Sequence, residues 1–382
     1  MTGLLSRDFR ANPLYDLVLF DRLPAGQRGA LAELAREPGF YGVLRPRAES
    51  GLGVRSVDRD TALLFLTLRE PGPLPTYARG MLGEAAGRTV ARLVADGVLE
   101  VADGDAFVSG AAALRLLGGG VEELGNGRIA ALSLAALRHA QALPVDDVSR
   151  LSWSLYAFNR HPLTPLWRRT LPSAEAVEGH LGIDPGGRNR ERLDRSWVRL
   201  PMEGWLSWGT RGRDRSPSSW AGSTYKLYVS PAPEALAESF GAVLDALADA
   251  RAFQFKIGPD ALGLLRPDKI VAYFHGFDPL ARAAGIVEGR LGGTPAQGVP
   301  FTSEIGGDGL LSWGVDPPRN EGAGERESWR LWLARRLARA ILDARRSEGE
   351  GSEPWRFALE RLRLEGVDPA TWTPGALLWR EA

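Results

Sequence analysis

The chain has 382 residues, with 47 basic and 47 acidic side chains and a formal net charge of zero. This balance excludes a global attraction to nucleic acid or to an anionic membrane, so any anion site must be local. The absence of cysteine excludes disulfides, thiolate metal sites and cysteine nucleophiles. Neither an HExxH motif nor a GxxxxGK[ST] loop occurs, so we expect no metal, no nucleotide and no other cofactor.

Residues 1–117 are predicted to form a separate small domain. Short strands precede a helix that Asp58 or Asp60 can cap. A second helix, GRTVARLVADG, and a hairpin over residues 98–109 follow. Helices followed by a two-stranded wing predict a winged helix-turn-helix domain.

Two functions and one purely structural role fit such a domain. DNA binding is disfavoured, because Arg88 and Arg92 alone make a thin basic face on the second helix and acidic residues surround it. The stretch ARLVADGVLEV resembles the precursor-recognition domains of peptide-modifying enzymes, which bind a leader peptide as an added strand. The structural alternative stays open, since a fold does not determine a function.

The stretches GGG at 118–120 and GNG at 125–127 predict a linker, so the second domain is placed at residues 128–382. Its first part is helical and ends in a proline-rich loop that contains His161. This histidine is a candidate acid or substrate contact, although a lone loop histidine is more often a surface residue. The segment SWVRLPMEGWLSWGTRGRDRS predicts a strand, a turn, a strand and a basic loop. Arg213 in that loop can reach an anion, or the loop is simply solvated.

The most informative stretch runs from residue 223 to residue 274. It predicts strands at 224–229, 252–257 and 269–274, with a helix after the first strand for which Ser230 is the expected cap. Alternation places polar side chains on one face of these strands, and a short loop adds an arginine. The expected patch comprises Lys226, Tyr228, Lys256, Arg266, Lys269 and Tyr273.

Such a patch suits a phosphate dianion. Cations and phenols can hold its oxygens, while one amine acts as a base because cationic neighbours lower its pKa. Alternating strands also show polar residues to water, so solvated lysines are the competing interpretation.

The motifs YKLYVSP, FQFKIG and RPDKIVAYF resemble the phosphothreonine lyases of bacterial type III effectors and the lyase domains of lanthipeptide synthetases. They also resemble the HopA-type lyases of class V lanthipeptide and thioviridamide-like pathways. The resemblance implies that Lys256 is the base and that Lys226 contacts phosphate or a carbonyl. It places Arg266 and Lys269 in the phosphate-gripping segment. Tyr228 stands where many relatives have an acidic histidine.

The C-terminal third adds weaker candidates. The segment PFTSE resembles part of the lyase domains, which makes Thr302 a substrate-contact candidate, and Arg319 is a substitute phosphate ligand. An amphipathic helix begins at SWRLW; packing in a core fits it better than binding a membrane surface.

The sequence therefore predicts an α+β protein, with a lyase-like mixed-sheet domain after the winged helix-turn-helix. The expected activity is β-elimination of phosphate from phosphoserine or phosphothreonine in a precursor peptide, as in lanthipeptide biosynthesis. A separate Ser/Thr kinase and a cyclase are the expected partners, with no nucleic acid and no membrane. We expect a cytoplasmic protein, since no signal peptide or spanning segment is evident. The alternative is a non-catalytic scaffold that binds a phosphopeptide or a partner enzyme.

Overall fold

The computed structural model describes residues 3–47, 52–117, 124–211, 224–317, 327–346 and 353–375, together with Leu378. The chain divides into two compact units. Unit 1 comprises residues 1–122 and 339–365, and unit 2 comprises residues 123–338 and 366–382. The sequence assigned residues 339–365 to the second domain, whereas their contacts place them in unit 1. The predicted limits of independently folding domains, 1–117 and 128–382, stay a prediction.

Unit 1 is a mixture of short strands and helices. In its described part, four strands form an antiparallel sheet in the order β5-β1-β6-β7, and three form a second sheet in the order β2-β3-β4. The strands are β1 (Asp8–Ala11), β2 (Tyr15–Leu19), β3 (Phe40–Pro46), β4 (Arg55–Asp58), β5 (Gly72–Pro73), β6 (Leu99–Asp103) and β7 (Ala106–Val108). The helices are α1 (Ala25–Ala30), α2 (Arg59–Thr67), α3 (Thr76–Leu82), α4 (Ala86–Ala95) and α14 (Pro354–Leu364), with 3-10 turns between them.

Local chemistry explains several of these elements. The Asp58 side chain accepts the N–H of Thr61 and so caps α2, as its position predicts. The β6–β7 hairpin is also present. It begins one residue later and ends one residue earlier than the predicted range 98–109. Helices followed by this hairpin agree with the predicted element order, while the identity of the domain as a winged helix-turn-helix remains a proposal.

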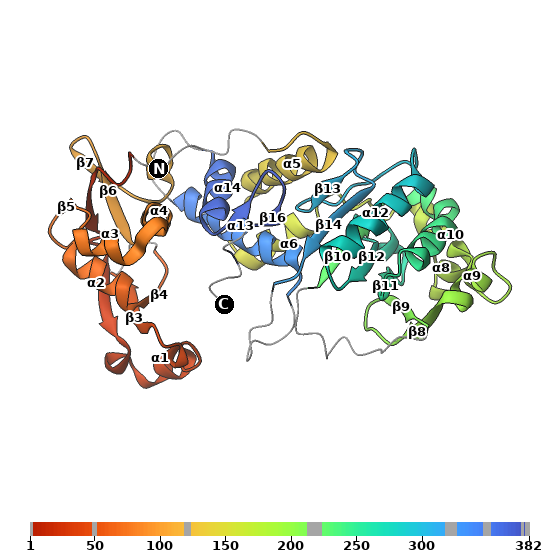
Figure 1. Cartoon of the computed structure of the whole chain (residues 1–382), viewed down its shortest axis with the longest axis horizontal. Helices are drawn as coiled ribbons and strands as arrows, with labels where there is room; N and C mark the ends of the chain where they lie inside the picture. Colours follow the sequence, from red (N-terminus) through yellow and green to blue (C-terminus); the bar gives the residue numbers. More distant parts are fainter. Residues whose placement is uncertain are drawn as a thin grey trace. The chain divides into compact units, whose positions relative to one another are not determined.

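Unit 2 is built on an antiparallel sheet whose described strands follow the order β13-β14-β10-β12-β11-β9-β8 (Figure 1). The strands are β8 (Trp197–Leu200), β9 (Leu206–Thr210), β10 (Tyr225–Val229), β11 (Gln254–Ile257), β12 (Ile270–Phe274), β13 (Ser303–Ile305) and β14 (Leu311–Val315). The three predicted central strands are therefore neighbours, and the predicted β8–β9 hairpin is confirmed. A further pair, β15 (Val367–Asp368) and β16 (Thr373–Pro374), completes the unit.

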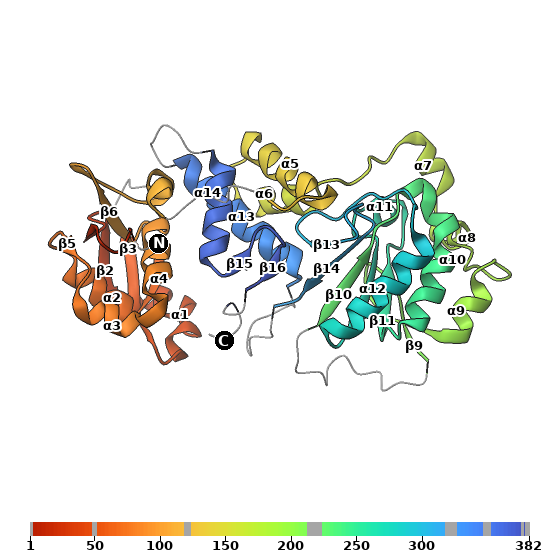
Figure 2. The same cartoon turned by 45° about the horizontal axis from the view of Figure 1, so that its top comes forward.

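Helices α10 (Pro233–Asp249) and α12 (Phe277–Leu291) lie together over one face of this sheet (Figure 2). The apolar stripe of α10 and the odd-numbered residues of β10 and β11 share one core, which includes Phe240, Leu227 and Phe255. The remaining helices are α5 (Arg128–Ala142), α6 (Val148–Tyr156), α7 (Pro165–Thr170), α8 (Ala174–Leu181), α9 (Arg190–Ser196), α11 (Ala261–Leu264) and the first part of α13 (Trp329–Arg346), whose residues from 339 onward belong to unit 1. With that face covered, the opposite face of the sheet is left for polar side chains.

One local expectation is wrong. Ser230 does not cap α10, which begins at Pro233 after Ala232 without a side-chain cap. The Ser230 hydroxyl instead donates to the carbonyl of Pro267 and accepts the N–H of Gly298. These tertiary bonds outweigh the local preference of serine for a helix start.

Candidate active site

The three lysines of the whole sequence, Lys226, Lys256 and Lys269, all lie in the central sheet region. Strand register brings two of them to one face. Lys226 of β10 is opposite Tyr273 of β12, and Lys256 of β11 is opposite Val271 of β12. Because side chains alternate along a strand, Lys226, Lys256 and Tyr273 project from the face opposite the α10 core.

Lys256 is a half-buried amine with aromatic neighbours. Its Nζ lies 3.9 Å from the ring centre of Trp205 and 5.9 Å from that of Tyr273. Among the described residues it makes no hydrogen bond and no ion pair. Burial lowers its pKa to about 8, and Lys226 and Arg266 add to that effect against the opposing charges of Asp268 and Asp316. Near neutral pH a usable fraction of this amine is thus unprotonated.

Lys226 is buried and paired. Its Nζ lies 2.6 Å from Oδ2 of Asp316 and 5.6 Å from the ring centre of Tyr273. Asp316 directly follows β14, and its other oxygen accepts the N–H of Trp329 at the start of α13. An ammonium group has three donors, so the pair leaves N–H groups for a substrate oxygen.

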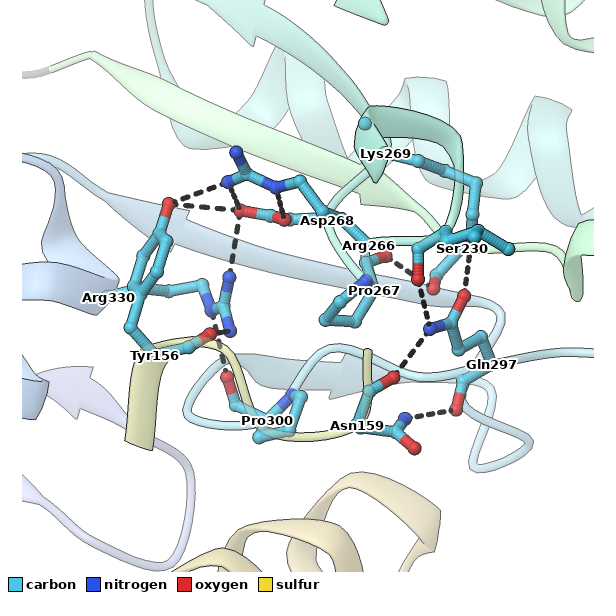
Figure 3. Close-up of polar contacts among 12 residues, drawn as sticks. Tyr156, Asn159, Ser230, Arg266, Pro267, Asp268, Lys269, Gln297, Pro300 and Arg330 are labelled. Atoms are coloured by element: carbon cyan, nitrogen blue, oxygen red, sulfur yellow. Dashed lines mark hydrogen bonds and ion pairs between the residues drawn. The ribbon is translucent and has the colours of Figure 1, made fainter. Parts of the chain in front are cut away.

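Arg266 belongs to a second charged group, the Asp268 cluster, which comprises Arg266, Asp268, Tyr156 and Arg330 (Figure 3). Arg266 binds Asp268 with Nε and Nη2, at 2.8 and 2.9 Å, and its Nη2 also lies 3.1 Å from the Tyr156 hydroxyl. Arg330 of α13 reaches the other side of the same carboxylate, with Nη1 2.8 Å from Oδ2. The Nη1 group of Arg266 has no partner among the residues described, so it is available to an anion.

The carboxyl group of Asp268 stays ionised because of its two arginine neighbours. Burial alone would raise the pKa of Asp268, but Arg330 and Arg266 hold that pKa far below its usual range. The cluster combines two guanidinium groups with one carboxylate, so it carries a net positive charge beside the lysine face.

Tyr228 lies on the same sheet face as Lys226 but is almost fully buried, packed with Val271 and Val299. Burial, and then the charge of Asp316, raise its pKa well above 10. The phenol therefore keeps its proton throughout the neutral range. It can serve as a hydrogen donor, and the structure gives it no role as a base.

The expected exposed position of Lys269 is wrong. Its side chain is fully buried, and Nζ donates to the carbonyl of Pro231, at 2.8 Å, and to Oε1 of Gln297. Burial lowers its pKa to about 7. Figure 3 shows that the segment from Arg266 to Lys269 separates the Asp268 cluster from this second network, which also includes Ser230 and Asn159. Lys269 turns away because uncharged acceptors of unit 2 enclose it.

The other predicted site residues fall in different places. The backbone N–H of His161 donates to the carbonyl of Leu265, which places this half-buried histidine next to Arg266 in the chain fold. Thr302 is fully buried and its hydroxyl donates to the carbonyl of Val299, so it is not exposed to a substrate. Arg213 and Arg319 lie outside the described residues.

Sequence reasoning missed several contributors: Asp268, Asp316, Tyr156, Arg330 and Trp205. The signal for Asp268 was present, because it stands inside the RPDK segment that supplied two candidates. Arg330 stood among many arginines of an amphipathic helix, and nothing local marked it as the one that is buried.

A pocket of about 240 Å³ is lined by Trp197, Trp208, Arg199 and neighbours, on the Phe255 side of the sheet and therefore opposite Lys256. In the described ranges, no group of three or more His, Asp or Glu side chains is arranged to hold a metal ion. No described helix is both long and apolar enough to cross a membrane.

Comparison with known proteins gives likenesses in fold. No model of a protein family and no curated protein matches the sequence. An effector protein from Pseudomonas syringae pv. tomato strain DC3000 aligns with a TM-score of 0.38 and 13% identity, over 65% of this chain and 97% of that chain. An effector from Pseudomonas syringae pv. syringae strain 61 aligns with a TM-score of 0.33 and 14% identity, over 64% and 98%. A structure solved for the catalytic mechanism of phosphothreonine lyase aligns with a TM-score of 0.25 and 13% identity, over 59% and 100%. At such low identity the roles of individual side chains rest on their own geometry.

Proposed function

We propose that this chain eliminates phosphate from a phosphothreonine or phosphoserine residue of a peptide, giving dehydrobutyrine or dehydroalanine. The observation that carries the proposal is the Lys256 amine, which has a lowered pKa and no polar partner among the described residues. It lies beside two cationic groups, Lys226 and Arg266, whose charges both reach it. An amine placed in this way can take a carbon-bound proton next to a bound dianion.

The reaction assigns one task to each group. Lys256 takes the α-proton, and the electron pair of that C–H bond becomes the new Cα–Cβ double bond as the Cβ–O bond breaks. Lys226 donates to the adjacent amide carbonyl and stabilises enolate character in the transition state. Arg266 binds the phosphate through its free Nη1, and Tyr228 gives a proton to the departing oxygen. The phosphate leaves as hydrogen phosphate. Lys256 then loses its extra proton to water, and Tyr228 regains a proton from water.

The wider setting is part of the same proposal. The motifs YKLYVSP, FQFKIG and RPDKIVAYF support a substrate that is a ribosomal precursor peptide, as in lanthipeptide-like pathways. The helices and β6–β7 hairpin of unit 1 support a winged helix-turn-helix that recognises the leader segment of that peptide. A separate kinase would supply the phosphorylated substrate, and a cyclase would consume the dehydrated product.

Mass spectrometry of a phosphothreonine peptide incubated with the protein tests the activity. We expect a mass loss equal to phosphoric acid, with a product that adds a thiol as dehydrobutyrine does. Lys256→Ala should reduce turnover by a factor of about 10² to 10⁴, the usual contribution of a general base. Binding of a non-hydrolysable phosphonate peptide to Lys256→Ala should persist, since Lys226 and Arg266 remain.

The matched control is Arg199→Ala, which removes an exposed cation on the opposite face of the same sheet. Its turnover should equal that of the unaltered protein. If the phosphopeptide binds but is never converted, the protein is a phosphopeptide-binding scaffold and the proposed reaction is wrong.

A further inference from the structure

Trp205 is an aromatic side chain that lies against both the proposed base and the proposed phosphate ligand. Its ring centre is 3.9 Å from Nζ of Lys256 and 4.9 Å from Cζ of Arg266. Both distances are within the range in which a cation is attracted to the face of an indole. One ring thus contacts two cations that come from different parts of the chain, a strand and a loop.

The β8–β9 hairpin fixes the ring in this place. Gly204 adopts a φ of +68°, which favours glycine, and the N–H of Trp205 closes the turn on the carbonyl of Met202 at 3.3 Å. Strand β9 follows at once, with Ser207 opposite Lys256 in the ladder. Trp205 directly precedes the first strand residue, Leu206, and its contact with Nζ of Lys256 places its ring on the face of that lysine.

The contact matters because the two cations repel each other. The charge of Arg266 lowers the pKa of Lys256, so the arrangement costs energy when both groups are protonated. Lys256 has no carboxylate or carbonyl partner among the described residues, which leaves ring faces as its specific contacts. The negative face of an indole offsets part of this repulsion and restricts both side chains at once.

We propose that Trp205 is a positioning residue for the elimination, and that its indole face holds the Lys256 amine and the Arg266 guanidinium at their working separation. This inference rests on the proposed function, which assigns the α-proton to one cation and the phosphate to the other. It adds the residue that sets the distance between the Lys256 amine and the Arg266 guanidinium.

Substitutions of Trp205 distinguish the attraction between its ring face and the Lys256 cation from the exclusion of water by its volume. Trp205→Phe keeps an aromatic face. Trp205→Leu keeps apolar volume but has no such face, so the ammonium form of Lys256 loses an attraction and its pKa should fall, by about half a unit. Trp205→Ala admits water, so the largest cause of the lowered pKa weakens and the pKa should rise. The two aliphatic variants are therefore expected to move the pKa in opposite directions.

Lysine NMR can measure this without a substrate. Protein labelled with ¹³C-lysine contains three labelled side chains, and Lys256→Arg identifies the resonance of interest. We expect the titration midpoint of Lys256 to stay near its original value in Trp205→Phe, to fall in Trp205→Leu and to rise in Trp205→Ala. Trp313→Leu is the matched control, because that ring stacks on Tyr225 on the other face of the sheet. Equal midpoints in all variants, or equal rises in Leu and Ala, would overturn the proposal.

Turnover of the phosphothreonine peptide provides the second readout. Trp205→Phe should keep kcat within a few-fold, whereas Trp205→Leu should lose about 10- to 100-fold in kcat, as misplaced catalytic groups do. Full activity of Trp205→Leu would overturn the inference while leaving the proposed function intact. If the unaltered protein has no elimination activity, the proposed function fails, and the NMR titration still decides whether the indole holds Lys256.

Discussion

Lys256 differs from the other two lysines in its partners. Lys226 is paired with Asp316, and Lys269 is satisfied by a carbonyl and a glutamine, whereas Lys256 meets only ring faces among the residues described. Alternation along the strands predicted that Lys226 and Lys256 share a face, and the register confirms it. Alternation could not predict partners, because Asp316 is ninety residues away from Lys226 in sequence.

The lowered pKa of Lys256 leads to a pH prediction. The unprotonated amine is the active form, so kcat/KM should rise with pH along a limb with a midpoint near 8. No falling limb is expected below pH 10, because the pKa of Tyr228 is raised well above that value. Initial rates of phosphopeptide elimination from pH 6 to pH 10 measure both features.

A chemical variant assigns the limb to this residue. Since the chain has no cysteine, Lys256→Cys can be alkylated selectively with bromoethylamine to give a thioether analogue of lysine. Its amine is less basic than that of lysine, so the limb should move to lower pH while activity returns. An unmoved limb in the alkylated protein would assign the titration to another group.

At the scale of elements, the segment between α11 and β12 lies between the two polar networks and contributes residues to each. Its residues alternate between them: Arg266 and Asp268 enter the cluster with Tyr156 and Arg330, and Lys269 enters the network of Gln297. The sequence predicted the strand that follows, because its apolar residues alternate. It placed Lys269 on the wrong side, since alternation applies within β12 and Lys269 precedes the first strand residue, Ile270.

Removing the charge of Asp268 should destabilise the protein strongly. Asp268→Asn leaves Arg266 and the fully buried Arg330 facing a neutral amide, and breaking a buried pair in this way costs about 3 to 5 kcal/mol. The folded-state pKa of Asp268 is depressed, so its stabilisation is present above the unfolded pKa of about 4 and is lost as the pH falls further. Urea unfolding at pH 7 and at pH 3.5 measures the difference, which should shrink at the lower pH.

Asp249→Asn is the control for that experiment. Asp249 is paired with Arg290 at the surface, with 58% of its side chain exposed, and such a pair contributes less than about 1 kcal/mol. If both variants lose the same small free energy, the Asp268 cluster is not the anchor of Arg266 that its geometry indicates.

At the scale of the whole molecule, the sequence predicted helix α14 itself but not the unit to which it belongs. Helix α14 was predicted as a short helix after the amphipathic α13 and was placed with the lyase-like domain. In the structure it packs on α4, and Arg361 pairs with Asp96 and Asp343 in unit 1. Amphipathic spacing shows that a helix has an apolar face, but it does not show which core receives that face.

This assignment predicts how fragments of the chain behave. Residues 1–122 alone lack α14, whose side chains Trp355, Phe357 and Leu359 are buried and contribute about 1.5 to 3 kcal/mol each. We therefore expect that fragment to unfold without a cooperative thermal transition. Joining residues 339–365 to it through a flexible glycine-serine linker should restore cooperativity, as followed by circular dichroism and calorimetry. The same fusion with Leu359→Asp is the control and should fail, because a carboxylate would enter the core of unit 1. If residues 1–122 melt cooperatively by themselves, at the midpoint of the fusion, then α14 is dispensable and the limit predicted from the sequence is the better description of the domain.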